Sequence, residues 1–154
     1  AFSSSTEFCV WFLEQVGLRG ADYSYDFSRS DNPWCRLKFS SLDPSTGKQV
    51  ILERDSETDV LVVFKHINGS RSALHIENKL RTGKFEKFQP ELYPVRAKHW
   101  IDNPKYGNYQ SFKTVLVAPQ GFVAKNPEGS EMFNSVVTHE AIAVFLPIFT
   151  ATAN

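Results

Sequence analysis

The sequence predicts an α/β domain in which a mixed β-sheet is flanked by helices. β-branched and apolar runs alternate with stretches of helical periodicity, in the order helix, β-meander, helix, strand, helix. No repeat, linker or low-complexity tract divides the 154 residues, of which 42% are hydrophobic and 14% aromatic. We therefore expect one domain over residues 1–154, with enough apolar side chains for a full core.

The first predicted element is a helix over about Ser5 to Val16. Apolar residues recur there at helical spacing: Phe8, Cys9, Phe12, Leu13 and Val16. Ser4 followed by Glu7 three residues later is a capping-box pattern. A loop-like stretch is expected between this helix and the first strand.

Two strands are then expected at about Cys35 to Ser40 and Gln49 to Arg54, on either side of a "DPSTGK" turn. A β-hairpin follows. Its first strand is the apolar run from Asp59 to Phe64, its turn is "INGSR" around Asn68-Gly69, and its returning strand is "SALHIENKL".

The second helix is expected to begin late. Pro94 is tolerated only in a first helical turn, which predicts a helix from near Tyr93 to about Ile101, with Gln89 on its N-terminal approach. The remaining predicted elements are a strand over Ser111 to Ala118, a short strand over Ser135 to Thr138, and a last helix over Thr138 to Leu146.

Charged residues at the ends of the hairpin strands form the candidate site. Side chains alternate along a strand, so Glu77 and Lys79 point to one face, with Cα atoms about 7 Å apart, and Asn78 points to the other. Folding the strands about Gly69 places Asp59 opposite Lys79 and on the same face as Glu77. An exposed cross-strand ion pair on a solvated face would produce the same pattern.

Two carboxylates and a lysine on one face suit metal-dependent phosphodiester hydrolysis. Carboxylate oxygens bind Mg²⁺, which keeps several waters and accepts phosphate oxygens. The ion lowers the pKa of a bound water and stabilises charge on the phosphate. A neighbouring lysine can orient or deprotonate that water.

These residues resemble the motif of the PD-(D/E)xK nuclease superfamily, in which an acidic residue on one strand precedes Asp/Glu-x-Lys on the next. Asp59 and "ENK" at Glu77 to Lys79 match this order, and Gln89 with Tyr93 matches a glutamine and tyrosine on the following helix. The resemblance spans about residues 7–146. It implies a restriction-endonuclease-like core with a mixed sheet, an acidic hairpin and flanking helices.

The resemblance also implies roles for individual residues. The catalytic residues would be Asp59, Glu77, Lys79 and Gln89, and Mg²⁺ or Mn²⁺ would be held by Asp59, Glu77 and the backbone carbonyl of Asn78. In the family a glutamate on the first helix often approaches the metal, which makes Glu7 a further candidate ligand, although helix capping alone would explain it.

The sequence departs from the family at three positions, the third of which is Pro94, directly after the tyrosine. Thr58 stands where the eponymous proline would be, and Leu92 replaces an arginine that commonly precedes the tyrosine. The second change puts one phosphate or structural contact in doubt. His75 shares the face of Glu77, and we interpret it as a hydrogen-bonded strand histidine.

The net charge argues against nucleic-acid binding, but the distribution of charge favours it. The chain has 17 basic and 17 acidic residues, whereas nucleic-acid binders usually carry a basic excess. Basic and aromatic residues nevertheless alternate after the proposed metal ligands, and we expect DNA contacts from Lys84, Lys87, Tyr93 and Arg96. The alternative is a solvated loop and helix face.

The predicted function is divalent-metal-dependent hydrolysis of DNA, as a defence, restriction, repair or toxin module. The alternatives are a non-catalytic nuclease-like module that binds DNA or a protein partner, and a different α/β domain in which the hairpin acids are surface charges. The expected partner is DNA, and a homodimer or a place in a larger protein or complex is compatible with the sequence. Cys9 in the apolar stripe favours a reducing, cytoplasmic compartment, and no run is long enough for a membrane span.

Overall fold

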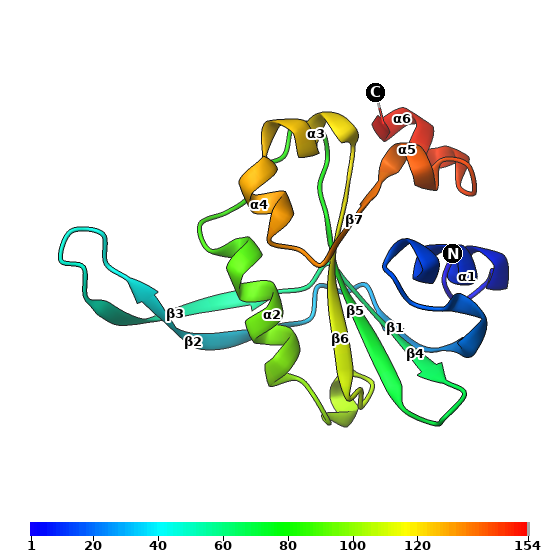
Figure 1. The fold of residues 1–154 in the computed structure, drawn as a ribbon, viewed down its shortest axis with the longest axis horizontal. Helices are drawn as coiled ribbons and strands as arrows, with labels where there is room; N and C mark the ends of the chain where they lie inside the picture. Colours follow the sequence, from blue (N-terminus) through cyan, green and yellow to red (C-terminus); the bar gives the residue numbers. More distant parts are fainter. Residues whose placement is uncertain (154) are drawn as a thin grey trace.

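The computed structural model describes residues 1–153, in which a five-stranded mixed sheet forms the centre (Figure 1). The strand order is β1-β4-β5-β6-β7. Their bounds are β1 Tyr23–Arg29, β4 Val60–His66, β5 Arg71–Asn78, β6 Ser111–Ala118 and β7 Ser135–Thr138. The first three strands in this order pair antiparallel and the last three pair parallel, which confirms the predicted α/β class with a mixed sheet.

One face of the sheet is covered by α1 (Thr6–Gln15). Its apolar stripe packs on alternate residues of the strands, including Val62, Leu74 and Val117. The helix has the predicted extent, but the capping-box prediction is wrong. Ser5, not Ser4, is the N-cap, and its hydroxyl accepts from the backbone N–H of Phe8 at 3.2 Å.

The opposite face is covered by α2 (Gln89–His99), which begins earlier than predicted. Pro94 lies inside this helix, where it removes one backbone hydrogen bond. The ring is on the exposed side of the helix, so it displaces no packed neighbour. The first turn is held independently, because the side-chain oxygen of Gln89 accepts from the backbone N–H of Glu86 at 3.1 Å.

The edge strand β1 occupies a stretch that the sequence analysis assigned to a loop. Its residues "YSYDFSR" are largely polar because β1 pairs only with β4 and has one partly exposed face. An irregularity between Tyr25 and Phe27 shifts the pairing and breaks the alternation that would have revealed a strand.

The strands β2 (Trp34–Leu42) and β3 (Gln49–Glu57) form a separate two-stranded sheet, which we call the arm. Both were predicted, and both extend further than expected. The arm projects away from the central sheet beside α2 (Figure 1). Its inner face packs against the start of α2, where the rings of Phe39 and Phe88 lie 5.2 Å apart. At its base, the backbone N–H of Thr58 donates to the carbonyl of Pro33 at 3.0 Å.

The C-terminal third confirms β7 and corrects the helices around it. Two short helices, α3 (Gln120–Lys125) and α4 (Pro127–Glu131), lie where only a loop was expected. The predicted last helix is shortened to α5 (His139–Ile142), because Leu146 is extended before Pro147. The other short elements are η1 Gly20–Asp22, η2 Pro104–Tyr106, η3 Pro147–Phe149 and α6 Thr150–Ala153. Within residues 1–153 no helix has the length and apolar character needed to cross a membrane.

Candidate functional site

The β4–β5 register brings Asp59 opposite Glu77. Val60 pairs with Ile76 and Leu61 with His75, so the residue before β4 faces Glu77. The predicted pairing of Asp59 with Lys79 is wrong by two residues, because the turn is centred on Asn68 rather than Gly69 and His66 N–H donates to the Ser70 carbonyl at 2.8 Å. A shift of two residues preserves side-chain parity, so Asp59 and Glu77 do share a face.

Glu77 is the centre of a hydrogen-bonded cluster on the α2 face of the sheet. Its carboxylate is only 2% exposed. Glu77 Oε1 lies 2.7 Å from Lys79 Nζ and accepts from Gln89 Nε2 at 2.9 Å, while Oε2 accepts from the Tyr93 hydroxyl. Lys79 Nζ also donates to Gln89 Oε1 at 2.9 Å. The structure thus brings together four residues that the sequence analysis selected: Glu77, Lys79, Gln89 and Tyr93.

Asp59 lies beside this cluster and is oriented by its own hydrogen bonds. Its Oδ2 accepts from the backbone N–H of Asn78 at 2.8 Å, and its Oδ1 accepts from Asn32 Nδ2 at 3.2 Å. The backbone N–H of Asp59 points to the Tyr93 hydroxyl at 3.4 Å. The same hydroxyl therefore contacts both acidic residues of the candidate site.

The electrostatic environment disfavours negative charge at this position. Burial raises the pKa of Glu77, and the charge of Asp59 raises it further, against the opposing effects of Lys79 and Tyr93. Burial and the same two carboxylates raise the pKa of the Tyr93 hydroxyl well above its ordinary value, so it stays protonated and donates. A cation between the carboxylates would relieve this repulsion.

Arg96 does not lie on the nucleic-acid-facing surface that was predicted for it. The side chain is 0% exposed. Its Nε donates to Thr58 Oγ1 at 2.8 Å, Nη1 donates to Ser56 Oγ, and the guanidinium carbon stacks 4.2 Å from the centre of the Tyr93 ring. Tyr93 is equally buried. Both residues are packed inside the protein, where Arg96 stacks on the Tyr93 ring and Tyr93 donates to Glu77.

A buried histidine extends this support. His75 Nδ1 lies 2.9 Å from Thr58 Oγ1, and Nε2 lies 2.9 Å from the Tyr109 hydroxyl. Burial lowers the pKa of His75 well below its ordinary value, followed by a smaller effect of Arg96, so the ring is neutral. The interpretation as a hydrogen-bonded strand histidine is confirmed. Thr58, which stands where the family's proline would be, joins Arg96 to His75 through its hydroxyl, a role that no local sequence pattern indicated.

Two acidic candidates lie away from the cluster. Glu7 is exposed on α1, which packs on the face of the sheet opposite to Glu77. Glu57, two residues before Asp59, is exposed at the end of β3, where it pairs with Trp34 and lines the cavity described below. Neither joins Asp59 and Glu77.

A cavity of about 690 Å³ lies between the arm and the start of α2. Its lining includes Gln89, which bonds both Glu77 and Lys79, together with the exposed side chains of Trp34 and Lys87. Lys84 is also exposed on the segment before α2. The cavity borders the cluster through Gln89, and three acidic residues, Asp55, Glu57 and Glu86, also line it.

The donor set suits a hard cation but is small. Across residues 1–153 no group of three or more His, Cys, Asp or Glu side chains is placed to hold a metal ion. Asp59 and Glu77 supply two carboxylates, and Mg²⁺ commonly binds through one or two carboxylates with waters and substrate oxygens. The participation of the Asn78 backbone carbonyl stays a prediction.

Comparisons of the chain with known protein families, with curated proteins and with solved structures found no match.

Proposed function

We propose that this chain is a divalent-metal-dependent nuclease that hydrolyses DNA on a restriction-endonuclease-like core of the PD-(D/E)xK type. One observation carries the proposal: the acidic hairpin and the start of α2 bring the motif residues into mutual contact, with Asp59 opposite Glu77 and Gln89 bonded to both Glu77 and Lys79. An exposed surface ion pair would not require a buried carboxylate that accepts three donors.

In this proposal Asp59, Glu77 and the Asn78 carbonyl hold Mg²⁺ or Mn²⁺. When bound, the ion lowers the pKa of a coordinated water and stabilises charge on the phosphate. Lys79 is the group that orients or deprotonates the attacking water. Gln89 accepts from Lys79 and donates to Glu77, so it holds the two in a defined relation.

The proposed DNA surface consists of Lys84 and Lys87 beside the cavity under the arm. Both ammonium groups are on exposed side chains, and Lys87 Nζ lies 5.1 Å from the centre of the Phe88 ring. Phosphate contacts of this kind position a nucleic acid without reading its sequence. The module would serve restriction, defence, repair or a toxin.

Nicking of supercoiled plasmid DNA tests the proposal. We expect cleavage with Mg²⁺ or Mn²⁺, none with EDTA, and loss of cleavage in Asp59→Ala and Lys79→Ala. Calorimetric titration with Mn²⁺ separates the two roles, because Asp59→Ala removes an anionic ligand whereas Lys79→Ala removes a neighbouring cation. Lys65→Ala, on the exposed side of β4, is the matched control and retains cleavage. Full cleavage by Lys79→Ala would disprove the assignment.

One observation favours a second candidate, a nuclease-like module that binds DNA or a protein without cleavage. The Glu77 carboxylate already has two donors at Oε1 and one at Oε2, which leaves a metal a single acceptor position at Oε2 unless it displaces Lys79, Gln89 or Tyr93. The Mn²⁺ titration distinguishes the candidates. Retained DNA affinity with no uptake of Mn²⁺ by the wild-type protein would select the binding module.

A further inference from the structure

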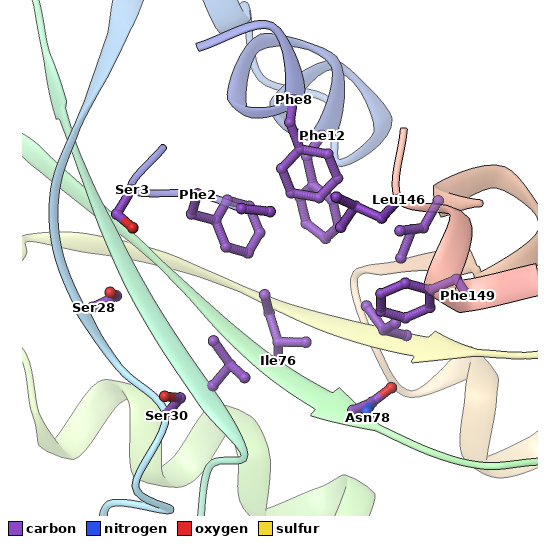
Figure 2. Close-up of a pocket in the computed structure, with 14 residues that line it drawn as sticks. Phe2, Ser3, Phe8, Phe12, Ser28, Ser30, Ile76, Asn78, Leu146 and Phe149 are labelled. Carbon is purple, nitrogen blue, oxygen red and sulfur yellow. The ribbon is translucent and has the colours of Figure 1, made fainter. Parts of the chain in front are cut away.

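A second cavity, of about 400 Å³, lies on the α1 face of the sheet, on the side away from Glu77. Phe8 and Phe12 of α1 form one wall, Leu146 and Phe149 of the C-terminal segment form another, and Ile76 lies at the sheet. Figure 2 shows the aromatic rings gathered above Ile76. Because three separate parts of the chain enclose this space, its shape is set by the fold and not by one flexible loop.

The cavity has an apolar body and a polar margin. Of the labelled polar residues, Ser3 lies beside Phe2, whereas Ser28, Ser30 and Asn78 lie around Ile76 on the side away from Phe8 and Phe12 (Figure 2). No lining side chain is charged, and among the lining residues only Ala1 carries a formal charge, through its α-amino group. Burial of an ion without a counter-charge is costly, so the chemistry of the walls selects a neutral ligand.

The side chain of Asn78 is a pre-oriented anchor at this margin. Its Oδ1 lies 3.0 Å from Nε2 of His139, which is only 1% exposed and meets the Phe149 ring edge-on at 5.0 Å. In the His139 tautomer with its proton on Nε2, the ring donates to Oδ1, and the amide NH₂ group of Asn78 is then the group that can donate to a ligand. A ligand carbonyl or hydroxyl oxygen would accept from it.

We propose that this cavity is a binding site for a small neutral ligand with an aromatic or short aliphatic body and one hydrogen-bond acceptor. The body packs among the rings of Phe8, Phe12 and Phe149, and the acceptor receives the Asn78 amide. The volume lies within the range of ordinary small-molecule sites. The cavity lies on the other face of the sheet from the nuclease cluster, so this inference does not depend on the proposed function.

Fluorescence titration with 6-propionyl-2-(dimethylamino)naphthalene tests the proposal, because this neutral probe combines an aromatic body with a carbonyl and its emission shifts to the blue in apolar surroundings. We expect saturable one-to-one binding. Leu146→Trp fills the cavity and should raise the dissociation constant of the probe by about tenfold or more. Ile148→Trp, at a 79% exposed position of the same segment, is the matched control and should change it by less than about twofold.

A second cavity-filling variant, Val60→Phe, approaches from the sheet and repeats the test without altering the C-terminal segment. Nuclear Overhauser contacts between the probe and the methyl groups of Val60, Ile76 and Leu146 in the wild-type protein locate the ligand without any substitution. Non-saturable binding, wild-type affinity in both filled variants, or absence of these contacts would overturn the proposal.

Discussion

Replacing Glu77 with Gln removes a negative charge whose burial in the folded protein is unfavourable. Burial raises the pKa of Glu77, and the nearby charge of Asp59 adds to this effect. The ionised carboxylate is therefore less stable in the folded protein than in the unfolded chain. Gln has nearly the same shape and no charge at any pH, so we expect the stability difference between the variant and the wild type to depend on pH.

The direction of this dependence follows from proton linkage. Between the ordinary pKa of 4.5 and the raised folded value, folded wild-type protein binds more protons than unfolded protein. Its free energy of unfolding should then fall as pH rises, with a slope from this group of at most about 1.4 kcal/mol per pH unit. Below 4.5 the contribution vanishes, and above the folded pKa the full cost of the charge remains. Glu77→Gln should therefore gain stability relative to wild type as pH rises.

Urea unfolding from about pH 4 to pH 7, in EDTA and followed by tryptophan fluorescence, measures this difference. Burial lowers the pKa of His75 and of His139, which opposes the slope of Glu77, but both histidines are present in both proteins and their effects cancel in the comparison. Glu7→Gln, which neutralises an exposed carboxylate on α1, is the control for charge alone. A difference that stays constant with pH would show that the contacts with Lys79 and Tyr93 balance burial and Asp59, and the opposite slope would show that they outweigh them; either result would disprove the expected direction.

Four further experiments test the buried support of the site, the packing of Gly20 against α1, and the proposed DNA surface. Arg96→Ala removes two hydrogen bonds and a stacked cation from a fully buried position, so it should lower the free energy of unfolding in urea by about 3 kcal/mol or more. Arg96→Lys should lower it less. A loss below about 1 kcal/mol in the alanine variant would contradict this. Tyr93→Phe deletes the donor to Glu77 Oε2 and should extend the pH-dependent slope to higher pH, whereas an unchanged profile would mean that this bond is immaterial. Gly20→Ala would place a Cβ 2.4 Å from the carbonyl oxygen of Val10 and should lower the free energy of unfolding by about 1–3 kcal/mol. Gly121→Ala is the control, because the nearest atom to its Cβ would be Arg81 Nε at 3.8 Å, and it should not destabilise the protein. Equal stabilities of the two variants would refute the steric argument. Replacing both Lys84 and Lys87 with Ala should weaken DNA association and reduce its salt dependence by about one counterion per lost phosphate contact, and an unchanged salt slope would identify a merely solvated face.

The central hairpin was predictable because its sequence carries two strong local signals. An uninterrupted apolar run from Leu61 to Phe64 can only be a buried strand or helix, and Asn68-Gly69 marks the turn that selects a hairpin. The edge strand β1 was not predictable in the same way. Its polar residues take their strand conformation from pairing with β4, which is a tertiary effect that no local pattern reports.

The cluster at the candidate site was predictable in part, for a similar reason. A spacing of two along a strand places Glu77 beside Lys79. Gln89 and Tyr93 lie one helical turn apart because α2 begins at Gln89, whereas Pro94 had suggested a helix that begins near Tyr93. The burial of Arg96 follows from contacts with Thr58 and Ser56, about forty residues away in the chain, so its position on the helix suggested an exposed cation instead. The register error arose because the tight turn is closed at Ser70, which depends on backbone geometry more than on residue type.

Because the arm joins the central sheet through a narrow base, sequence changes in the outer arm and sequence changes in the sheet have different consequences for the candidate site. The chain leaves β1 at Arg29 and re-enters β4 beside it, since Arg29 pairs with Leu61, and the bond between Pro33 and Thr58 closes the base. The base of the arm is tied to the rest of the fold, because Ser56 accepts from buried Arg96 and Leu37 is itself buried. The outer part of the arm, residues 40–51, can therefore lengthen, shorten or be exchanged without altering the register of any strand in the central sheet. Variation there changes the surface that the arm presents while Asp59 and Glu77 keep their mutual geometry, and a graft between residues 40 and 51 would do the same.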